Sequence, residues 1–333
     1  MPTWEVTATL DEPAPLVLAF VAHHLAMGAD RINLYFDRTP QGDLSLLAGE
    51  PRVRMTQCDG DYWRKMGWRP PLHVDRQIVN ANHAYTRGQS EWMLHCDADE
   101  FISDGEALRA ALHTLPADVP SLRLTAFERC FTADQDNESV FGGDLRGPIP
   151  QLYSGSLAAE YPPAVAAMLQ NGMTAYVGEK SLSRIGAQVA VGIHHTFVRD
   201  RTAQGSADTR TPFARSPDVP LFHFDGLTPR HTSKKLRRKT IDVDTDALVA
   251  RLGPARMAQI AAFSAPQADP AALFFALRQM PPKVAEVLST LGLIATQSLR
   301  PDTAAHWHWP EATLDFSPQA VDGPLVTDDI KVA

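Results

Sequence analysis

Short apolar runs and longer amphipathic runs alternate over the first 127 residues of the chain. Runs rich in β-branched and aromatic residues predict strands, and runs with apolar residues at helical spacing predict helices. The predicted strands are residues 4–9, 31–36, 52–56, 91–96 and 121–127. The predicted helices are residues 16–27, 73–87 and 105–113, and Gly28 follows the first as a left-handed cap. This alternation predicts an α/β fold, a mostly parallel sheet flanked by helices with ligand sites beyond the carboxyl ends of its strands.

The pattern changes in the rest of the chain. Residues 132–182 are rich in Gly, Pro and Asn, which is typical of an active-site loop region. An ordered stretch, residues 189–224, is interrupted by a polar loop at 200–211, and helical patterns dominate after residue 240. The tail from residue 297 shows no clear periodicity. We therefore predict a catalytic α/β domain over residues 1–240 and a mainly helical C-terminal extension over residues 241–333.

Charge and cysteine content narrow the function classes. The 333 residues carry 31 Lys and Arg against 39 Asp and Glu, a net charge of -8, which argues against nucleic-acid binding. An acidic chain can still hold a small dianion if a metal ion or a local basic cluster supplies positive charge. The three cysteines show no CxxC spacing, so we expect no disulfide framework and a cytoplasmic location. Neither an export signal nor a run of 18 apolar residues is visible in the sequence.

The pair Asp97 and Asp99 is the most distinctive chemical feature. The sequence holds five D-x-D pairs, and this one alone directly follows an apolar predicted strand. In extended backbone, residues two apart point the same way, so the two carboxylates would suit Mg²⁺ or Mn²⁺. The alternative is a turn at the end of the strand, in which the acids cap the following helix.

Asp37 ends another predicted strand, residues 31–36. A carboxylate at this edge of the sheet can accept a hydrogen bond from a nucleobase N–H or a ribose hydroxyl. The alternative is an ordinary aspartate that begins a turn before Pro and Gly.

Five segments, taken in order, resemble glycosyltransferase family 2, and more narrowly its type 4 branch, which is related to family 92. The segments are Leu10-Asp-Glu12, His24-Leu-Ala-Met-Gly28-Ala-Asp-Arg-Ile, Tyr35-Phe-Asp37, Arg76-Gln77 with Asn80, and Trp92-Met-Leu-His-Cys-Asp97-Ala-Asp99-Glu100-Phe101. The resemblance covers about residues 3–240. It departs from the family pattern at Asp11, where Asn is usual, and at Thr39, where Ser is usual, and it is lost after about residue 245.

This resemblance implies a GT-A fold and a metal-dependent, inverting transfer of a sugar. The donor would be a nucleotide-diphosphate sugar, such as a UDP-sugar. The acceptor would be a glycan or glycolipid, and a glycolipid acceptor would be compatible with peripheral membrane association. Mn²⁺ or Mg²⁺ would be held by Asp97 and Asp99. Glu12, Asp37 and Arg76 would lie around the nucleotide.

Two further segments extend the candidate site. In Gly178-Glu179-Lys180, the lysine could balance phosphate charge and Glu179 could act as the base near the acceptor, with Asp134, Asp136 and Asp225 as further candidates. The pair His194-His195 follows, and an adjacent pair of this kind is more often one packed and one solvated ring than two ligands.

The last candidates lie between residues 221 and 239. His223 follows an aromatic strand and would complete the metal shell, which favours Mn²⁺. The basic run 234–239 includes Lys234 and Lys235, which would hold the diphosphate. The alternative for such a run is a solvated helix face.

Two other function classes stay open. A metal-dependent hydrolase would gather His194, His195 and His223 around Asp97 and Asp99, whereas a binding protein would keep the fold without the chemistry. HExxH, GxSxG and Walker A patterns do not occur.

Overall fold

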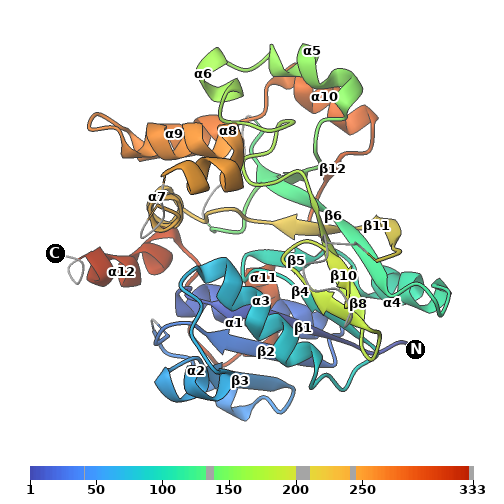
Figure 1. Cartoon of the computed structure of the whole chain (residues 1–333). Helices are drawn as coiled ribbons and strands as arrows, with labels where there is room; N and C mark the ends of the chain where they lie inside the picture. Colours follow the sequence, from blue (N-terminus) through green and yellow to red (C-terminus); the bar gives the residue numbers. More distant parts are fainter. Residues whose placement is uncertain (41, 133–138, 200–210, 241–244, 330–333) are drawn as a thin grey trace. The chain divides into compact units, whose positions relative to one another are not determined.

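The computed structural model describes residues 1–40, 42–132, 139–199, 211–240 and 245–329 (Figure 1). The chain divides into two compact units, each built from three separate stretches. The first unit comprises Met1–Thr125, Gly178–Leu221 and Ser298–Leu314. The second unit comprises Ala126–Val177, Phe222–Gln297 and Asp315–Ala333.

The first unit contains a sheet with a parallel part formed by four neighbouring strands. Its strands β1 (Trp4–Leu10), β2 (Arg31–Phe36), β3 (Val53–Gln57) and β4 (Trp92–His95) run parallel in the order β4-β1-β2-β3. β8 (Glu179–Arg184) pairs antiparallel with β4 and with the first half of β6 (Ser121–Cys130). The predicted α/β class with a mostly parallel sheet is confirmed, and the carboxyl ends of β1, β2 and β4 meet at one edge, as βαβ connections require.

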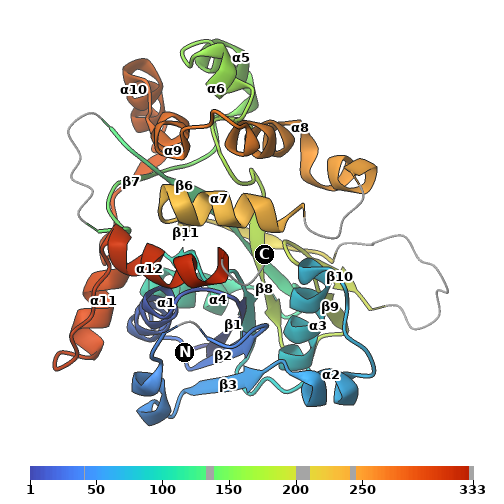
Figure 2. The same cartoon turned by 90° about the vertical axis from the view of Figure 1, so that its left-hand side faces the viewer.

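Helices cover both faces of this sheet. α1 (Ala14–Ala26) lies on one face, where His24 packs edge-on against Trp4 with 6.3 Å between ring centroids. α3 (His73–Tyr85) lies on the other face, where Asn80 donates to the Thr9 hydroxyl at 3.0 Å (Figure 2). Side chains alternate between the faces of a strand, so β1 supports both helices at once.

α1 ends as its sequence predicts and is buried on nearly all sides. Gly28 follows it with φ 86°, a conformation that a side chain disfavours. The cover on its outer side is α11 (Pro301–His308), which packs against α1 from the far end of the chain. The tail, which shows no periodicity in sequence, therefore contains a helix that completes the first unit.

The remaining elements of the first unit surround this sheet. They are η1 (Ser45–Gly49), α2 (Gly60–Met66), β5 (Glu100–Ile102), α4 (Gly105–Thr114), the hairpin strands β9 (Val189–Val191) and β10 (Thr196–Val198), and β11 (Ala214–His223), whose last two residues belong to the second unit. α2 was not predicted from the sequence pattern. Asp59 caps this short helix, because its side chain accepts a hydrogen bond from the Tyr62 N–H.

The second unit is mainly helical. Its strands are the second half of β6, β7 (Asp144–Arg146) and β12 (Ile294–Ala295), all antiparallel. Its helices are η2 (Gln151–Tyr153), α5 (Ser154–Ala158), α6 (Pro163–Ala166), α7 (Pro229–Arg238), α8 (Thr245–Ser264), α9 (Pro270–Arg278), α10 (Pro282–Thr290) and α12 (Pro318–Asp329). Leu157, Leu277, Val284 and Leu288 form much of its apolar core.

Two absences apply to the described part of the chain. None of its helices combines the length and the apolarity that crossing a bilayer demands. Cys58, Cys96 and Cys130 are all buried, and none of them forms a disulfide in the described structure.

Candidate functional site

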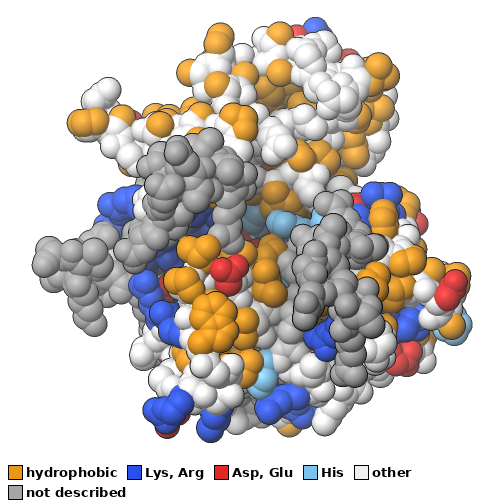
Figure 3. All heavy atoms as spheres, viewed as in Figure 1, with side chains coloured by type: hydrophobic (Ala, Val, Ile, Leu, Met, Phe, Trp, Pro, Cys, Tyr) orange, Lys and Arg blue, Asp and Glu red, His pale blue; other side chains and the backbone are white. Residues whose placement is uncertain are grey.

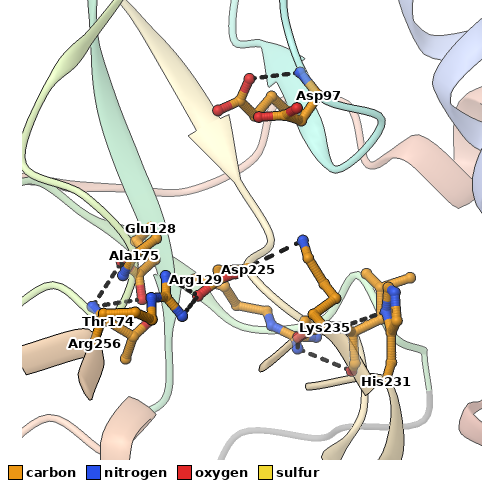
Figure 4. A network of polar contacts seen from close by, with 12 residues as sticks. Asp97, Glu128, Arg129, Thr174, Ala175, Asp225, His231, Lys235 and Arg256 are labelled. Carbon is orange, nitrogen blue, oxygen red and sulfur yellow. Dashed lines mark hydrogen bonds and ion pairs between the residues drawn. The ribbon is translucent and has the colours of Figure 1, made fainter. Parts of the chain in front are cut away.

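The D-x-D segment forms a turn between β4 and β5. The Glu100 N–H donates to the Asp97 carbonyl at 3.1 Å, and the Asp97 N–H donates to the Glu100 carboxylate at 2.8 Å (Figure 4). The expected extended backbone is therefore wrong at Asp97 and Asp99, because this reciprocal pair closes the chain on itself. The acid that caps the next helix is Asp104, which accepts from the first N–H groups of α4. We call residues 97–100 the acidic turn.

Lys180 of β8 neutralises the acidic turn. Its ammonium group lies 2.9 Å from Asp97 Oδ2 and 3.1 Å from Glu100 Oε2, and it is fully buried. Burial acts to lower the pKa of Lys180, but the carboxylates of Asp97 and Glu100 outweigh it, so the pKa is raised. Gln77 of α3 donates to the other Asp97 oxygen. The predicted contact of Lys180 with phosphate stays a prediction.

Two imidazoles near the acidic turn carry no charge at neutral pH. His95, at the end of β4, is buried and hydrogen-bonded to the Gly192 carbonyl at 2.9 Å. Burial and the charge of Lys180 lower the pKa of His95 to about 4 and that of His194 to about 3. The positive charge beside the acidic turn therefore comes from the ammonium group.

Asp37, at the end of β2, receives two charged side chains and an imidazole. Arg76 of α3 binds it bidentately, with Nε 2.8 Å from Oδ1 and Nη2 2.7 Å from Oδ2. Arg69 lies at 3.4 Å and His73 at 3.3 Å. Burial acts to raise the pKa of Asp37, but the hydrogen bonds and charges of His73 and Arg76 hold it well below its usual range. The predicted neighbours Asp37 and Arg76 are thus in direct contact.

Glu12 and Glu179 occupy less central positions. Glu12 lies in the loop between β1 and α1 and is half-buried. Glu179 begins β8, and its carboxylate binds Arg215 at 2.5 Å and Arg123 at 3.4 Å. Both oxygens of Glu179 contact a guanidinium group, so proton transfer by this residue requires an ion pair to open.

In the second unit, His223, the last residue of β11, and Asp225, which follows the strand, lie close together. Each offers a ligand atom within 4.8 Å of the other, and both are buried. The Tyr176 ring packs on His223 with 5.3 Å between centroids. Asp225 binds Arg256 at 3.1 Å and Lys235 at 3.7 Å (Figure 4). Burial acts to raise the pKa of Asp225, but these cations hold it well below the usual range.

Two buried arginines fix the backbone that follows Asp225. Arg278 donates to the Asp225 carbonyl, and Arg129 donates to the carbonyls of Gly226 and Leu227, both at 2.9 Å. Gly226 has φ 72°, so this turn needs glycine. Sequence reasoning missed both arginines, because a lone arginine in a strand or helix gives no sign of a distant carbonyl partner.

The basic run lies on α7, whose first turn is capped by the Thr228 hydroxyl. Lys235 is directed to Asp225, whereas Lys234 is half-buried on the same helix. One lysine of the basic run, Lys235, therefore forms an ion pair with Asp225. Neither the diphosphate hypothesis nor the solvated-face alternative predicts this contact.

The described structure brings together three groups of candidates. They are Asp97 with Lys180, Asp37 with Arg76, and His223 with Asp225 and Lys235. Asp134 and Asp136 lie outside the described residues. Within the described residues, neither His194 nor His195 belongs to a cluster of three potential metal-ligating side chains.

Each unit by itself offers donor atoms that suit a divalent cation. Asp99 is a buried carboxylate of the first unit, and His223 and Asp225 are a buried imidazole and a buried carboxylate of the second. Carboxylate oxygens suit both Mg²⁺ and Mn²⁺, and imidazole favours Mn²⁺. Asp97 fits this role less well, since Lys180 already provides it with a cation.

No family model matches this sequence. No curated protein matches it either. Several solved structures do match. TarS from S. aureus, residues 1–349, shares 12% identity over 78% of this chain and 70% of that chain, with a TM-score of 0.34. The mannosyltransferase PcManGT from Pyrobaculum calidifontis, in complex with GDP-Man and Mn²⁺, shares 14% over 99% and 86%, with a TM-score of 0.36.

A third solved structure is glucosyl-3-phosphoglycerate synthase from Mycobacterium tuberculosis, in complex with Mn²⁺, UDP and glucosyl-3-phosphoglycerate. It shares 10% identity over 55% of this chain and 57% of that chain, with a TM-score of 0.29. Identities and TM-scores this low support no conclusion about activity or substrate.

Proposed function

We propose that this chain is a metal-dependent glycosyltransferase of the GT-A type, which moves a sugar from a nucleotide-diphosphate sugar to an acceptor hydroxyl. One observation carries the proposal. Asp37 and Asp99, both buried, follow β2 and β4 of one parallel sheet, in which β1 alone separates the two strands. Ligands of α/β proteins bind beyond this carboxyl edge of the sheet. The finer assignment, to the type 4 branch of family 2 related to family 92, rests on the motif order in the sequence.

In this proposal, Asp99 and His223 bind Mn²⁺ or Mg²⁺. When bound, the ion would stabilise the charge that develops on the departing nucleoside diphosphate. Lys234 and Lys235 would add positive charge at the diphosphate, an electrostatic role that strengthens as the bond to the sugar breaks. Lys235 would exchange its present partner, Asp225, for a phosphate oxygen.

Glu12, Asp37 and Arg76 would orient the nucleoside. Arg76 binds both oxygens of Asp37, and Arg69 and His73 contact them at 3.4 and 3.3 Å. A ribose hydroxyl or a base N–H would therefore take the place of one of these two longer contacts. Inversion requires a base on the face of the sugar opposite the leaving group. Glu179 is the proposed base, and the exposed Arg215 would release it when an acceptor binds.

The proposal is tested by thermal-shift titration against a panel of UDP- and GDP-sugars, with and without Mn²⁺. We expect one nucleotide class to raise the melting temperature of the wild type in the presence of Mn²⁺, and Asp99→Asn to abolish this shift. Asp61→Asn, which removes an exposed carboxylate paired with Arg64, is the matched control and should keep the shift. If no nucleotide sugar stabilises the wild type with metal present, the transferase proposal fails.

We also propose a glycan or glycolipid acceptor and peripheral membrane association. Residues 147–177 contain a single charged residue, Glu160, which pairs with Lys283 at 2.8 Å. Leu152 in this segment is 84% exposed. In Figure 3, hydrophobic and uncharged side chains predominate over α5, α6 and α9 of the second unit. An uncharged surface with exposed apolar side chains suits a lipid interface.

Flotation with phospholipid vesicles tests this association. We expect the wild type to float with the vesicles and Leu152→Glu to float less, because a carboxylate opposes entry into the interface. Met55→Glu places the same charge at a half-exposed position on β3 of the first unit and should not change flotation. Equal flotation of all three proteins would contradict the proposal.

A hydrolase is not proposed, since neither His194 nor His195 joins a ligand cluster in the described part of the chain.

A further inference from the structure

We propose that the Lys180 ammonium group is a built-in cation of the acidic turn. Asp97 is then a positioning residue, and Asp99 alone presents a carboxylate from this turn to the metal ion. The first statement is independent of the proposed function, and the second rests on it.

The geometry places an ammonium group where a cation would bridge two carboxylates. Lys180 Nζ lies 2.9 Å from Asp97 Oδ2 and 3.1 Å from Glu100 Oε2. The first distance is that of a charge-assisted hydrogen bond, and the second is that of an ion pair. The Asp97 N–H also donates to Glu100, so the two ends of the turn are joined both directly and through the ammonium group.

Strand register determines this position of the lysine. β8 runs antiparallel to β4, with Leu182 opposite Leu94. Continued by two residues, that register sets Lys180 opposite Cys96, directly before Asp97. β8 also pairs with β6, where Leu124 faces Lys180, so the strand that carries the lysine lies between β4 and β6. Lys180 therefore belongs to a strand of the sheet and not to a loop.

Charge makes the ammonium group necessary. Glu100 and Lys180 are fully buried, and the Asp97 carboxylate beside them is 34% exposed. A buried carboxylate loses hydration and is repelled by a second one close to it, which is costly unless a cation compensates them. Lys180 provides this compensation whether or not a metal ion is bound.

The two aspartates of the motif therefore differ. The Asp97 side chain is 34% exposed and receives Lys180 and Gln77 on its two oxygens. Asp99 is almost fully buried. Replacing a residue that orients a metal site without binding the ion usually costs about 10–100-fold in metal affinity. We therefore expect the loss of Asp97, a positioning residue, to cost less metal affinity than the loss of the ligand Asp99.

The test removes the charge of Lys180 and asks whether a metal ion takes the place of the ammonium group. Lys180→Met keeps the length of the side chain and removes the charge, which leaves Asp97 and Glu100 without their ammonium partner. We expect the variant to bind one additional Ca²⁺ or Mn²⁺ per chain, counted by calorimetry and by elemental analysis. Its melting temperature should fall in EDTA and recover with Ca²⁺, whose flexible oxygen coordination suits two carboxylates.

Matched variants separate this role from a general loss of packing. Lys283→Met removes a lysine from the exposed pair with Glu160 and should bind no additional ion. The double variant Lys180→Met with Asp97→Asn restores the net charge of the triad and should also bind none. If Lys180→Met does not fold in EDTA, its refolding yield with Ca²⁺ replaces the melting temperature as the measurement.

Three results would overturn the inference. They are an unchanged ion count in Lys180→Met, a melting temperature or refolding yield of that variant that Ca²⁺ does not improve, and a loss of Mn²⁺ affinity in Asp97→Asn as large as that in Asp99→Asn. The ion count needs no nucleotide sugar. An additional ion in Lys180→Met together with no nucleotide binding by the wild type would therefore refute the proposed function and leave the built-in cation standing.

Discussion

At the scale of the residue, Asp37 contacts two arginines and an imidazole. We expect Asp37→Asn to lower the free energy of unfolding by about 3–5 kcal/mol, because it leaves the buried guanidinium of Arg76 without its counter-charge. Asp61→Asn, in an exposed pair, should change it by no more than about 1 kcal/mol. Urea unfolding of both variants measures the difference, and equal effects would contradict the prediction.

The same carboxylate makes stability depend on pH. The pKa of Asp37 in the folded chain is below its ordinary value of 3.8, so its contribution is fully present above that value and is lost as the pH falls from there toward the folded pKa. Unfolding free energies measured at neutral pH and at about pH 3 should therefore differ less in Asp37→Asn than in the wild type. An unchanged difference would show that Asp37 does not titrate as proposed.

Sequence reasoning located the charged residues better than it located their partners. The position of Asp37 after a strand follows from periodicity, and so does that of Asp97. Their contacts with Arg76 and Lys180 depend on which strands and helices become neighbours, and the spacing of 83 residues between Asp97 and Lys180 contains no signal of it. For the same reason Glu179 appeared available as a base, although two arginines hold it.

At the scale of the element, two glycines in equivalent positions have different neighbours. Gly105 and Gly60 are each the first residue of a helix, α4 and α2. A Cβ on Gly105 would lie 1.9 Å from the Met27 carbonyl oxygen, whereas one on Gly60 would meet nothing within 4 Å. We expect Gly105→Ala to destabilise by about 1–3 kcal/mol or more through overpacking. Gly60→Ala should stabilise by about 0.4–1 kcal/mol, since it restricts the unfolded chain.

Thermal unfolding of these two variants is the measurement. Equal effects would mean that the close approach of α4 to the end of α1 is absent in solution.

The strands and helices that alternate over residues 4–127 could mostly be predicted, whereas α2, β5, β8 and α11 could not. The bounds of β2 agree with the predicted strand, because a buried parallel strand reads as a continuous apolar run. α2 was missed because seven residues are too few to establish a helical period. α11 was missed because its Trp and His residues leave no apolar periodicity in the sequence. Its buried residues Ala304 and Ala305 are small, which lets α11 pack closely on α1.

At the scale of the whole molecule, Ser298–Leu314 belongs to the first unit although it follows most of the second along the chain. A chain that ends at residue 297 lacks α11 and exposes the apolar helix α1. We expect it to lose several kcal/mol of stability, since each large apolar side chain returned to water costs about 1.5–3 kcal/mol. A chain that ends at residue 329 keeps α11 and serves as the control. Circular dichroism melts would contradict the prediction if both chains unfolded at the same temperature.

The interleaving of the two units also sets the order in which they can be completed during synthesis. The strands of the parallel sheet precede Phe222–Gln297 of the second unit along the chain, and the helix that covers α1 follows that stretch. Until α11 has been synthesised, α1 lacks this cover and its apolar surface is open to solvent or to a chaperone. The first unit can therefore be completed only after Phe222–Gln297 has been translated.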